Sequence, residues 1–424
     1  MKKVLIVTYY WPPSGGAGVQ RWLKFSKYLP EFGCEPIILT VDLAYATYPV
    51  LDRTLENDVP ASLKVYRTKA TDWFKIYDKN KSKVPSAGFA KNNDNSIKGK
   101  ISRFVRGNFF LPDPRRGWNR YAIREASSII RRENINTVIT TSPPHSSQLI
   151  GRCLKKRFPE ITWIADLRDT WTDIFYYDLF YPTFIAKSID KNYEKTILLN
   201  ADKIVTVGQN LAETYISRAE GVNEKIHIIP NGYDEDDFRE INYGFPERYT
   251  ITYVGTLSDV YPLDAFLAAL TRIEKRGKDF LLRLVGSVST EIKMKINSQL
   301  SSDKTEFIPY IDHVQAIKYM AESSLLLLII PEQKKEKTHT PGKVFEYIAT
   351  RKPILYIGPS DGDAAYHLKV CGQTGGIFSE QNFEEIAKYI EENMKSKGPL
   401  LYMPHPEYSR RILTQNLARI LKGN

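Results

Sequence analysis

Short runs of aliphatic and β-branched residues alternate with helix-like segments along most of this 424-residue chain. Examples are KVLIVTY near the start, EPIILTV, TVIT at 137–140 and SSLLLLIIP at 323–331. These runs are apolar throughout, as expected for parallel strands that are buried on both faces of a sheet. Strands that alternate with helices in this way predict a doubly wound parallel α/β fold.

The alternation occurs in two series, and a chain of this length is too long for one ordinary hydrophobic core. Gly, Asn, Asp and Pro cluster between the two series, near residues 231–248. We therefore expect one Rossmann-like domain at 1–240, a second at 241–404, and a C-terminal amphipathic helix at 405–424. The periodicity fails at about 70–118, where polar stretches predict a mobile basic insertion.

The formal net charge is +11, and residues 91–132 hold eleven Lys or Arg against three Asp or Glu. Such a segment suits an anionic membrane, a nucleic acid, or simply a solvated surface. The stretch ISRFVRGNFFLP mixes apolar and basic residues as interfacial elements do, which favours a membrane or acceptor surface. The residues expected on that surface are Arg103, Arg106, Phe109, Phe110, Arg115, Arg116 and Trp118.

Cysteine usage and hydropathy predict the compartment. Cys34, Cys153 and Cys371 are scattered and lack CxxC spacing, which is typical of reduced thiols. The longest aliphatic run, 325–330, is far shorter than the roughly 20 residues that span a bilayer. The N-terminus lacks the pattern of a signal peptide. We expect a cytoplasmic protein that associates peripherally with the inner face of the plasma membrane.

A glycine-rich loop follows the first apolar run, in the stretch VLIVTYYWPPSGGAGVQRW. Gly15, Gly16 and Gly18 place bare backbone N–H groups at the start of a helix, which favours an anion such as a diphosphate. The spacing is neither G-x-G-x-x-G nor a P-loop, so it argues against a dinucleotide oxidoreductase and a P-loop nucleotidase. A tight turn without a ligand is the alternative interpretation.

A second helix start lies in THTPGKVFEYIATRKPILYIG. Thr340, Pro341 and Gly342 lead into a helix that carries Lys343 in its first turn and Glu346 shortly after. The free N–H groups of such a helix and the lysine charge can both bind phosphate oxygens. The Glu346 carboxylate can accept hydrogen bonds from ribose hydroxyls. The alternative is that Lys343 and Glu346 form a surface ion pair.

Six motifs occur in order along the chain: YYWPPSGGAGVQRW, TTSPPHSS at 140–147, ADLRDTW at 165–171, IPNGYDEDDF at 229–238, YVGTLS at 253–258 and PGKVFEYIATRKPIL at 341–355. With them the whole chain resembles the retaining, nucleotide-sugar-dependent glycosyltransferases of family four. The resemblance implies the GT-B arrangement, in which two Rossmann-like domains face a central cleft. It also implies sugar transfer to a glycan or lipid-linked acceptor in bacterial surface-polysaccharide synthesis.

The resemblance implies a UDP- or GDP-linked sugar as donor, with no further cofactor. No D-x-D motif follows an apolar strand, so we expect no obligatory metal. The working hypothesis is front-face attack assisted by a diphosphate oxygen. The expected catalytic residues are His145, Arg168, Asp169 and Glu346. The expected donor-binding residues are Gly15, Gly16, Gly18, Asn231, Gly255, Thr256, Thr340, Pro341, Gly342, Lys343 and Glu346.

Two of the catalytic candidates have structural alternatives, His145 as a cap of the helix from Ser146 and Asp169 as the ion-pair partner of Arg168. The chain also departs from the family pattern. Thr338 stands where many members carry the first of two glutamates, and GTLSDVYPL lacks the usual Arg and Lys. Many members carry a histidine after the strand where this chain reads ADLRDTW, and Arg168 and Asp169 occupy its neighbourhood here. A nucleotide-sugar epimerase of GT-B fold and a non-enzymatic nucleic-acid-binding protein that uses 91–132 remain alternatives.

Overall fold

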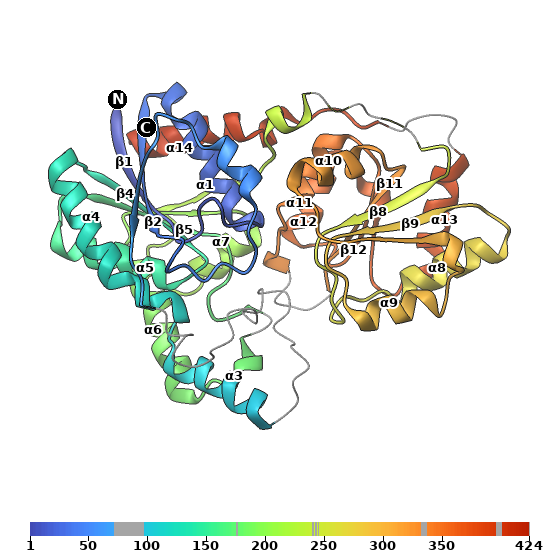
Figure 1. Ribbon diagram of the computed structural model, residues 1–424, viewed down its shortest axis with the longest axis horizontal. Helices are drawn as coiled ribbons and strands as arrows, with labels where there is room; N and C mark the ends of the chain where they lie inside the picture. Colours follow the sequence, from blue (N-terminus) through green and yellow to red (C-terminus); the bar gives the residue numbers. More distant parts are fainter. Residues whose placement is uncertain are drawn as a thin grey trace. The chain divides into compact units, whose positions relative to one another are not determined.

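The computed structural model describes residues 1–71, 97–174, 177–239, 241, 244, 246–331, 337–395 and 401–423. The chain forms two compact units (Figure 1). Unit 1 comprises Met1–Asn231 and Arg410–Asn424, and unit 2 comprises Gly232–Ser409. The boundaries differ from the predicted 240/241 and 404/405. Tyr233 forms a β-bridge with Ser409, and its N–H donates to the Tyr408 main-chain oxygen, so both connecting segments join unit 2.

Unit 1 contains a seven-stranded sheet in the order β3-β2-β1-β4-β5-β6-β7, with every pair parallel. The strands are β1 (Lys2–Val7), β2 (Cys34–Val41), β3 (Lys64–Thr68), β4 (Thr137–Ser142), β5 (Thr162–Leu167), β6 (Lys203–Thr206) and β7 (Ile226–Ile228). The α-helices of the described residues are α1 (Ala17–Tyr28), α3 (Ile97–Phe109), α4 (Asn119–Glu133), α5 (Ser146–Arg157), α6 (Phe184–Asn200), α7 (Gln209–Ile216) and α14 (Arg410–Lys422). This is the doubly wound α/β fold that the sequence predicts.

The central strand β1 is buried between two helical layers. Val4 and Ile6 pack into one core cluster with α1 and α14, whereas Leu5 and Val7 pack into another with α4 and α5. Figure 1 shows these two pairs of helices on opposite sides of the sheet. Because successive side chains of a strand point to opposite faces, a strand covered on both faces must be apolar at every position.

Unit 2 contains a six-stranded parallel sheet in the order β10-β9-β8-β11-β12-β13. The strands are β8 (Thr250–Val254), β9 (Leu281–Val285), β10 (Thr305–Ile308), β11 (Leu325–Ile329), β12 (Ile354–Ile357) and β13 (Ile377–Phe378). The α-helices of the described residues are α8 (Asp264–Lys275), α9 (Thr290–Asn297), α10 (His313–Ala321), α11 (Lys343–Thr350), α12 (Asp363–Val370) and α13 (Phe383–Lys395).

Strand β11 shows the same two-sided burial in unit 2. Leu325, Leu327 and Ile329 pack with α8, α9 and α13, whereas Leu326 and Leu328 pack with α10, α11 and α12. The run LLLLI is therefore divided between two cores, which explains why it contains no polar residue.

The sequence predicts a mobile insertion at about 70–118, but the second half of that region is helical. Residues 72–96 lie outside the described part of the chain, but α3 covers 97–109 and a 3-10 helix, η5, covers Pro114–Trp118. The expected surface position of Trp118 is wrong. Its indole is buried, packs edge-on against Tyr9 and donates to the Thr68 hydroxyl.

None of the helices in the described residues combines the length and the apolar composition that crossing a bilayer requires.

Candidate functional site

The sheet of unit 2 reverses its strand order between β8 and β11, which are neighbours in space. In open parallel α/β sheets, ligands bind outside the carboxyl ends of the strands at such a switch point. The loop after β8 begins at Gly255, and the loop after β11 ends at Gly342, where α11 begins. Two of the predicted donor-binding segments therefore lie together at the carboxyl ends of adjacent strands.

Lys343, the first residue of α11, points across this switch point toward β8. Its ammonium group donates to the Val254 main-chain oxygen at 3.1 Å and lies 3.8 Å from the centroid of the Tyr253 ring. Burial lowers the pKa of Lys343 to about 7, although nearby Glu346 raises it in part. A bound anion at this site would favour the charged form of the lysine.

Gly255 makes room for the Lys343 side chain. Its φ of +128° favours glycine, and a Cβ there would lie 3.3 Å from the lysine Nζ. Gly286, directly after β9, also lies close to Gly255, since a Cβ at Gly286 would lie 2.4 Å from the Gly255 main-chain oxygen. The Tyr347 hydroxyl accepts the Val254 N–H at 2.9 Å and ties α11 to β8. Glycines and a tyrosine thus fix the position of the lysine.

Glu346 has a partner that the sequence did not indicate. Its carboxylate lies 2.9 Å from Nε2 of His313, the first residue of α10, and Nδ1 of His313 lies 3.8 Å from the Asp237 carboxylate. Asp237 belongs to a 3-10 helix, η7 (Glu235–Phe238). These side chains are mostly buried, so the imidazole holds the Glu346 carboxylate in place at the start of α11.

Two buried hydroxyls flank the switch point without a hydrogen-bond partner in the described part of the chain. Thr340 precedes α11, and Ser258 lies in the loop after β8. Buried polar groups are nearly always hydrogen-bonded, so a bound ligand or water is the expected partner of each. Ser258 was not among the predicted donor-binding residues, although it is the last residue of the motif YVGTLS.

The interpretation of Lys343 and Glu346 as a simple surface pair is wrong, because each side chain turns to a partner on another element. Lys343 bonds the end of β8, and Glu346 bonds α10. Thr256, another predicted donor-binding residue, lies in the loop after β8, where its main-chain oxygen accepts a hydrogen bond from the Tyr253 hydroxyl at 2.7 Å.

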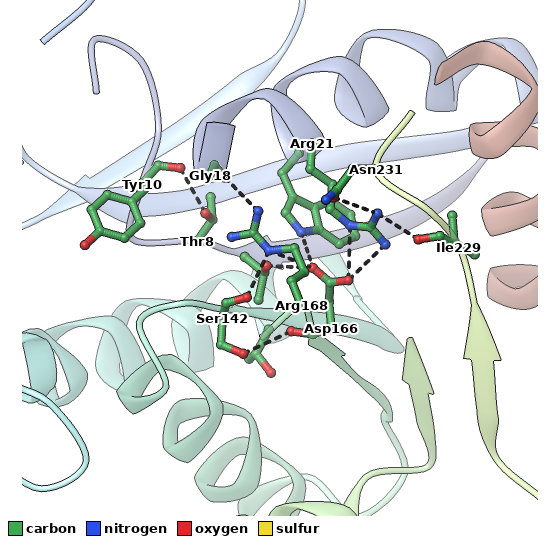
Figure 2. Close-up of polar contacts among 12 residues, drawn as sticks. Thr8, Tyr10, Gly18, Arg21, Ser142, Asp166, Arg168, Ile229 and Asn231 are labelled. Carbon is green, nitrogen blue, oxygen red and sulfur yellow. Dashed lines mark hydrogen bonds and ion pairs between the residues drawn. The ribbon is translucent and has the colours of Figure 1, made fainter. Parts of the chain in front are cut away.

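In unit 1 the structure brings the glycine loop next to Arg168 (Figure 2). The guanidinium donates to the Gly18 main-chain oxygen at 3.0 Å and to that of Ser142 at 2.9 Å. The predicted alternative, an ion pair of Arg168 with Asp169, is wrong in its partner. The nearest carboxylate that the guanidinium pairs with is that of Asp166, at 3.8 Å. Arg168 therefore positions the first turn of α1.

Asp166, at the carboxyl side of β5, is the centre of a buried network (Figure 2). Its carboxylate is 3.1 Å from the Arg21 guanidinium and accepts from Trp22 at 2.8 Å and from the Thr141 hydroxyl at 2.7 Å. Arg21 also donates to the Ile229 and Pro230 main-chain oxygens at 2.9 Å, and it contacts the Asn231 side chain at 3.4 Å. Asn231 thus belongs to the network of unit 1, and its predicted role in donor binding stays a prediction.

His145 stacks on Trp171, with ring centroids 4.7 Å apart. Burial lowers the pKa of His145, whereas the carboxylates of Asp113 and Asp169 raise it. His145 occupies the N-cap position of α5, but its side chain makes no capping hydrogen bond. Asp113 satisfies the start of the helix instead, since its carboxylate accepts the Ser146 N–H at 2.7 Å and the Ser146 hydroxyl at 2.9 Å. A largely neutral imidazole beside Asp169 suits the predicted role of orienting an acceptor hydroxyl.

Two family models match the sequence. Residues 87–237 match the model described as Glycosyltransferase Family 4, and residues 234–409 match Glycosyl transferases group 1. Together the matches extend from the middle of unit 1 to the end of unit 2. The chain belongs to the group 1 glycosyltransferases. A comparison with curated protein sequences gives no match.

Solved structures similar to this glycosyltransferase have the same fold along nearly their whole length. Sucrose-phosphate synthase from Thermosynechococcus elongatus has a TM-score of 0.57 at 13% identity, over 99% of this chain and 95% of that one. The catalytic domain of starch synthase IV from Arabidopsis thaliana, bound to ADP and acarbose, has a TM-score of 0.62 at 11% identity, over 100% of this chain and 98% of that one. A candidate UDP-N-acetylglucosamine 2-epimerase from Listeria monocytogenes has a TM-score of 0.55 at 11% identity, over 100% of this chain and 96% of that one. At these identities the likeness shows the fold alone.

Proposed function

We propose that this glycosyltransferase takes a nucleotide sugar at the switch point of unit 2 and transfers the sugar with retention of anomeric configuration. The observation that carries the proposal is the position of Lys343. Its ammonium group lies at the N-terminus of α11 and at the carboxyl end of β8, where a phosphate can replace the Val254 oxygen as its partner. The starch synthase neighbour, which has the same fold, is bound to ADP.

The leaving group explains why a lysine at a helix start is useful. Breaking the bond between the sugar and the diphosphate increases the negative charge on the diphosphate oxygens. Interactions that strengthen with this charge lower the barrier, whereas equal binding of the ground state does not. The N–H groups at Gly342 and the Lys343 ammonium supply such interactions. In this proposal they take the place of a metal ion, so the reaction needs no obligatory metal.

Donor recognition is assigned to the groups around the lysine. The Glu346 carboxylate, held by His313, accepts hydrogen bonds from the ribose hydroxyls. The buried hydroxyls of Thr340 and Ser258 are further donors or acceptors for the nucleotide sugar. A UDP- or GDP-linked sugar satisfies this set of partners.

Retention follows from front-face attack. The bond between the anomeric carbon and the diphosphate oxygen breaks as the acceptor oxygen bonds to the same face of the sugar. The departing diphosphate oxygen takes the acceptor proton, so no separate base and no covalent enzyme intermediate is required. In unit 1, His145 and Asp169 orient the acceptor hydroxyl. The acceptor is a glycan or a lipid-linked glycan, used at the inner face of the membrane in surface-polysaccharide synthesis.

Binding of the purified protein to UDP-, GDP-, TDP- and ADP-sugars tests this function. A bound donor at about a hundred times its Kd stabilises the protein by roughly 3 kcal/mol, which thermal unfolding detects. Lys343→Ala and Glu346→Ala should weaken that stabilisation, and Lys278→Ala, an exposed lysine of unit 2, should not. Unchanged donor binding in both site variants would contradict the proposal.

Product analysis separates the reaction classes. A retained anomeric configuration by NMR, with turnover unchanged by a chelator, is the expected result. Conversion of the donor sugar into its epimer without any acceptor would instead identify an epimerase of the same fold.

A further inference from the structure

Large apolar side chains are exposed on two segments of unit 1 that lie far apart in sequence. Phe184 and Ile185, in the first turn of α6, are 86% and 70% exposed, and Phe109 at the end of α3 is 75% exposed. Further exposed apolar residues of α3 are Ile97, Ile101 and Phe104. A soluble surface rarely gathers so many large apolar side chains, and such a patch marks a binding surface.

The two segments form one surface because they are locked together. A 3-10 helix, η6 (Asp178–Phe180), packs on α3, and α3 also contacts α6. The Asn108 side chain donates to the Tyr181 main-chain oxygen at 3.1 Å and accepts the Thr183 N–H at 2.7 Å. Gly107 permits this contact, since a Cβ there would lie 2.3 Å from the Phe180 main-chain oxygen. In Figure 1, α3 and α6 lie side by side at one end of unit 1.

The same surface is positively charged. Helix α3 has the sequence IKGKISRFVRGNF, which contains four basic residues and no acidic one. The Arg106 guanidinium lies 4.2 Å from the centroid of the Phe180 ring, and that of Arg103 lies 5.8 Å from the Tyr181 ring. Lys191 of α6 is exposed about two turns beyond the apolar tip. Basic and apolar side chains are thus interleaved on α3 and α6. Between them η6 adds Phe180 and one carboxylate, that of Asp178, which pairs with Lys187 at 3.0 Å. We call these three elements the α3–α6 surface.

We propose that the α3–α6 surface docks on an anionic lipid bilayer, with Phe109, Phe184 and Ile185 inserted among the headgroups. Amphipathic elements with basic and large apolar residues bind in this way, through apolar burial together with attraction to anionic lipids. A second copy of the chain would bring the same positive charge to the interface, and a nucleic acid would bury the protruding aliphatic side chains only by intercalation between its bases. Docking would bring the enzyme to a lipid-linked acceptor, so the biological purpose of this surface rests on the acceptor proposed above.

Co-sedimentation with lipid vesicles tests the surface without any acceptor. At near-physiological salt, the wild type should bind vesicles of phosphatidylglycerol and phosphatidylethanolamine and should bind pure phosphatidylcholine weakly. The double variant Phe184→Ser with Ile185→Ser should lower the partition coefficient by about tenfold or more. Lys100→Glu with Lys191→Glu should lower it by at least about tenfold, because each basic group near an anionic surface contributes roughly fivefold.

Matched controls separate the surface from general hydrophobicity and charge. Leu199→Ser removes an exposed apolar side chain at the other end of α6, and Lys275→Glu with Lys278→Glu changes two exposed charges of unit 2. Both should bind vesicles like the wild type. Thermal stabilisation by the donor shows that each variant is folded. If the donor does not stabilise the wild type, the proposed function is contradicted and the docking surface is not.

Three outcomes would overturn the docking proposal. One is vesicle binding that neither surface variant reduces. Another is dimer formation by the wild type that Phe184→Ser with Ile185→Ser abolishes, without vesicle binding. The third is retention on DNA at physiological salt without vesicle binding.

Discussion

The Nζ atom of Lys343 lies 3.1 Å from the main-chain oxygen of Val254, which is the last residue of β8, one of the two central strands of unit 2. A lysine in that position donates to a neutral group although a helix start that favours anions is beside it. The exchange of this carbonyl for a phosphate oxygen is the step on which the proposed donor site depends.

The first prediction concerns the pH dependence of donor binding. Burial lowers the pKa of Lys343 to about 7, so the free side chain is largely neutral at higher pH. A bound diphosphate favours the charged form, so binding takes up a proton and weakens as the pH rises above 7. Calorimetry of a nucleotide sugar in buffers of different ionisation enthalpy measures that proton.

The variant Lys343→Met should bind the donor about tenfold to a hundredfold more weakly, as expected for the loss of a hydrogen bond to a charged group. Its remaining affinity should not depend on pH in this range. The same pH dependence in the variant as in the wild type would assign the titration to another group.

The second prediction concerns the stability of the free protein. The pKa of Lys343 is lower in the folded chain than its ordinary value of 10.5, so the unfolded chain binds more protons between these values. The free energy of unfolding should therefore rise with pH from about 7 upward through this contribution. Lys343→Met should remove that rise and should be most stabilising, relative to wild type, below pH 7. Urea unfolding at several pH values without donor measures both effects.

The third prediction assigns a positioning role to His313. Its Nε2 lies 2.9 Å from the Glu346 carboxylate, so His313→Ala should raise the KM for the donor by about tenfold, with a smaller change in kcat. His313→Gln retains a donor near Nε2 and should recover part of the loss. His405 makes a similar contact with Glu407 at 2.8 Å, and His405→Ala serves as the control. An equal effect of the control would show that stability, rather than the orientation of Glu346, is responsible.

The fourth prediction concerns the buried pair of Arg21 and Asp166. Both side chains are fully buried, so Arg21→Met or Asp166→Asn leaves one polar group without its partner and should destabilise the protein by about 3–5 kcal/mol. The exposed pair of Arg276 and Glu391 is the control, and Arg276→Met should cost about 1 kcal/mol or less. Urea denaturation of the variants compares the two pairs. Similar values would mean that the network of Asp166 contributes little.

The fifth prediction compares two glycines with positive φ. Gly277→Ala meets open space at φ +70° and should cost about 1–2 kcal/mol through backbone strain alone. Gly286→Ala has the same kind of strain, and its Cβ also clashes with the Gly255 main chain, so a further cost of about 1–3 kcal/mol is expected. Donor binding should fall in Gly286→Ala only, because Gly255 borders Lys343. Equal stability and donor affinity in both variants would show that the strand ends move freely.

The apolar runs were sufficient to predict the parallel sheets, because burial on both faces leaves few alternatives for such sequences. Edge strand β3 was missed, since KVYRT is half-exposed and mixes charged with apolar residues. Helix α3 was missed although Ile97, Ile101 and Phe104 recur at helical spacing, because the helix contains two glycines and follows a polar stretch without periodicity.

The candidate site divides in the same way. Its local parts could be predicted from the sequence, since the Gly342 helix start, Lys343 and Glu346 are neighbours along one segment. The segment after β8 was also predicted through Gly255 and Thr256. The contacts of Lys343 with Val254 and of Glu346 with His313 could not be predicted, because they join separate elements only after the sheet has formed. The aromatic stack of His145 on Trp171 and the burial of Trp118 likewise depend on packing between distant segments.

By itself the sequence determined the fold class, the order of the elements and the segments that carry the chemistry, because hydrophobic burial and helix starts act over a few residues. Only the tertiary structure decided the lowered pKa of Lys343, the partner of Glu346 and the joining of α3 to α6. Desolvation and contacts between distant residues set these properties, and neither is encoded in a local pattern.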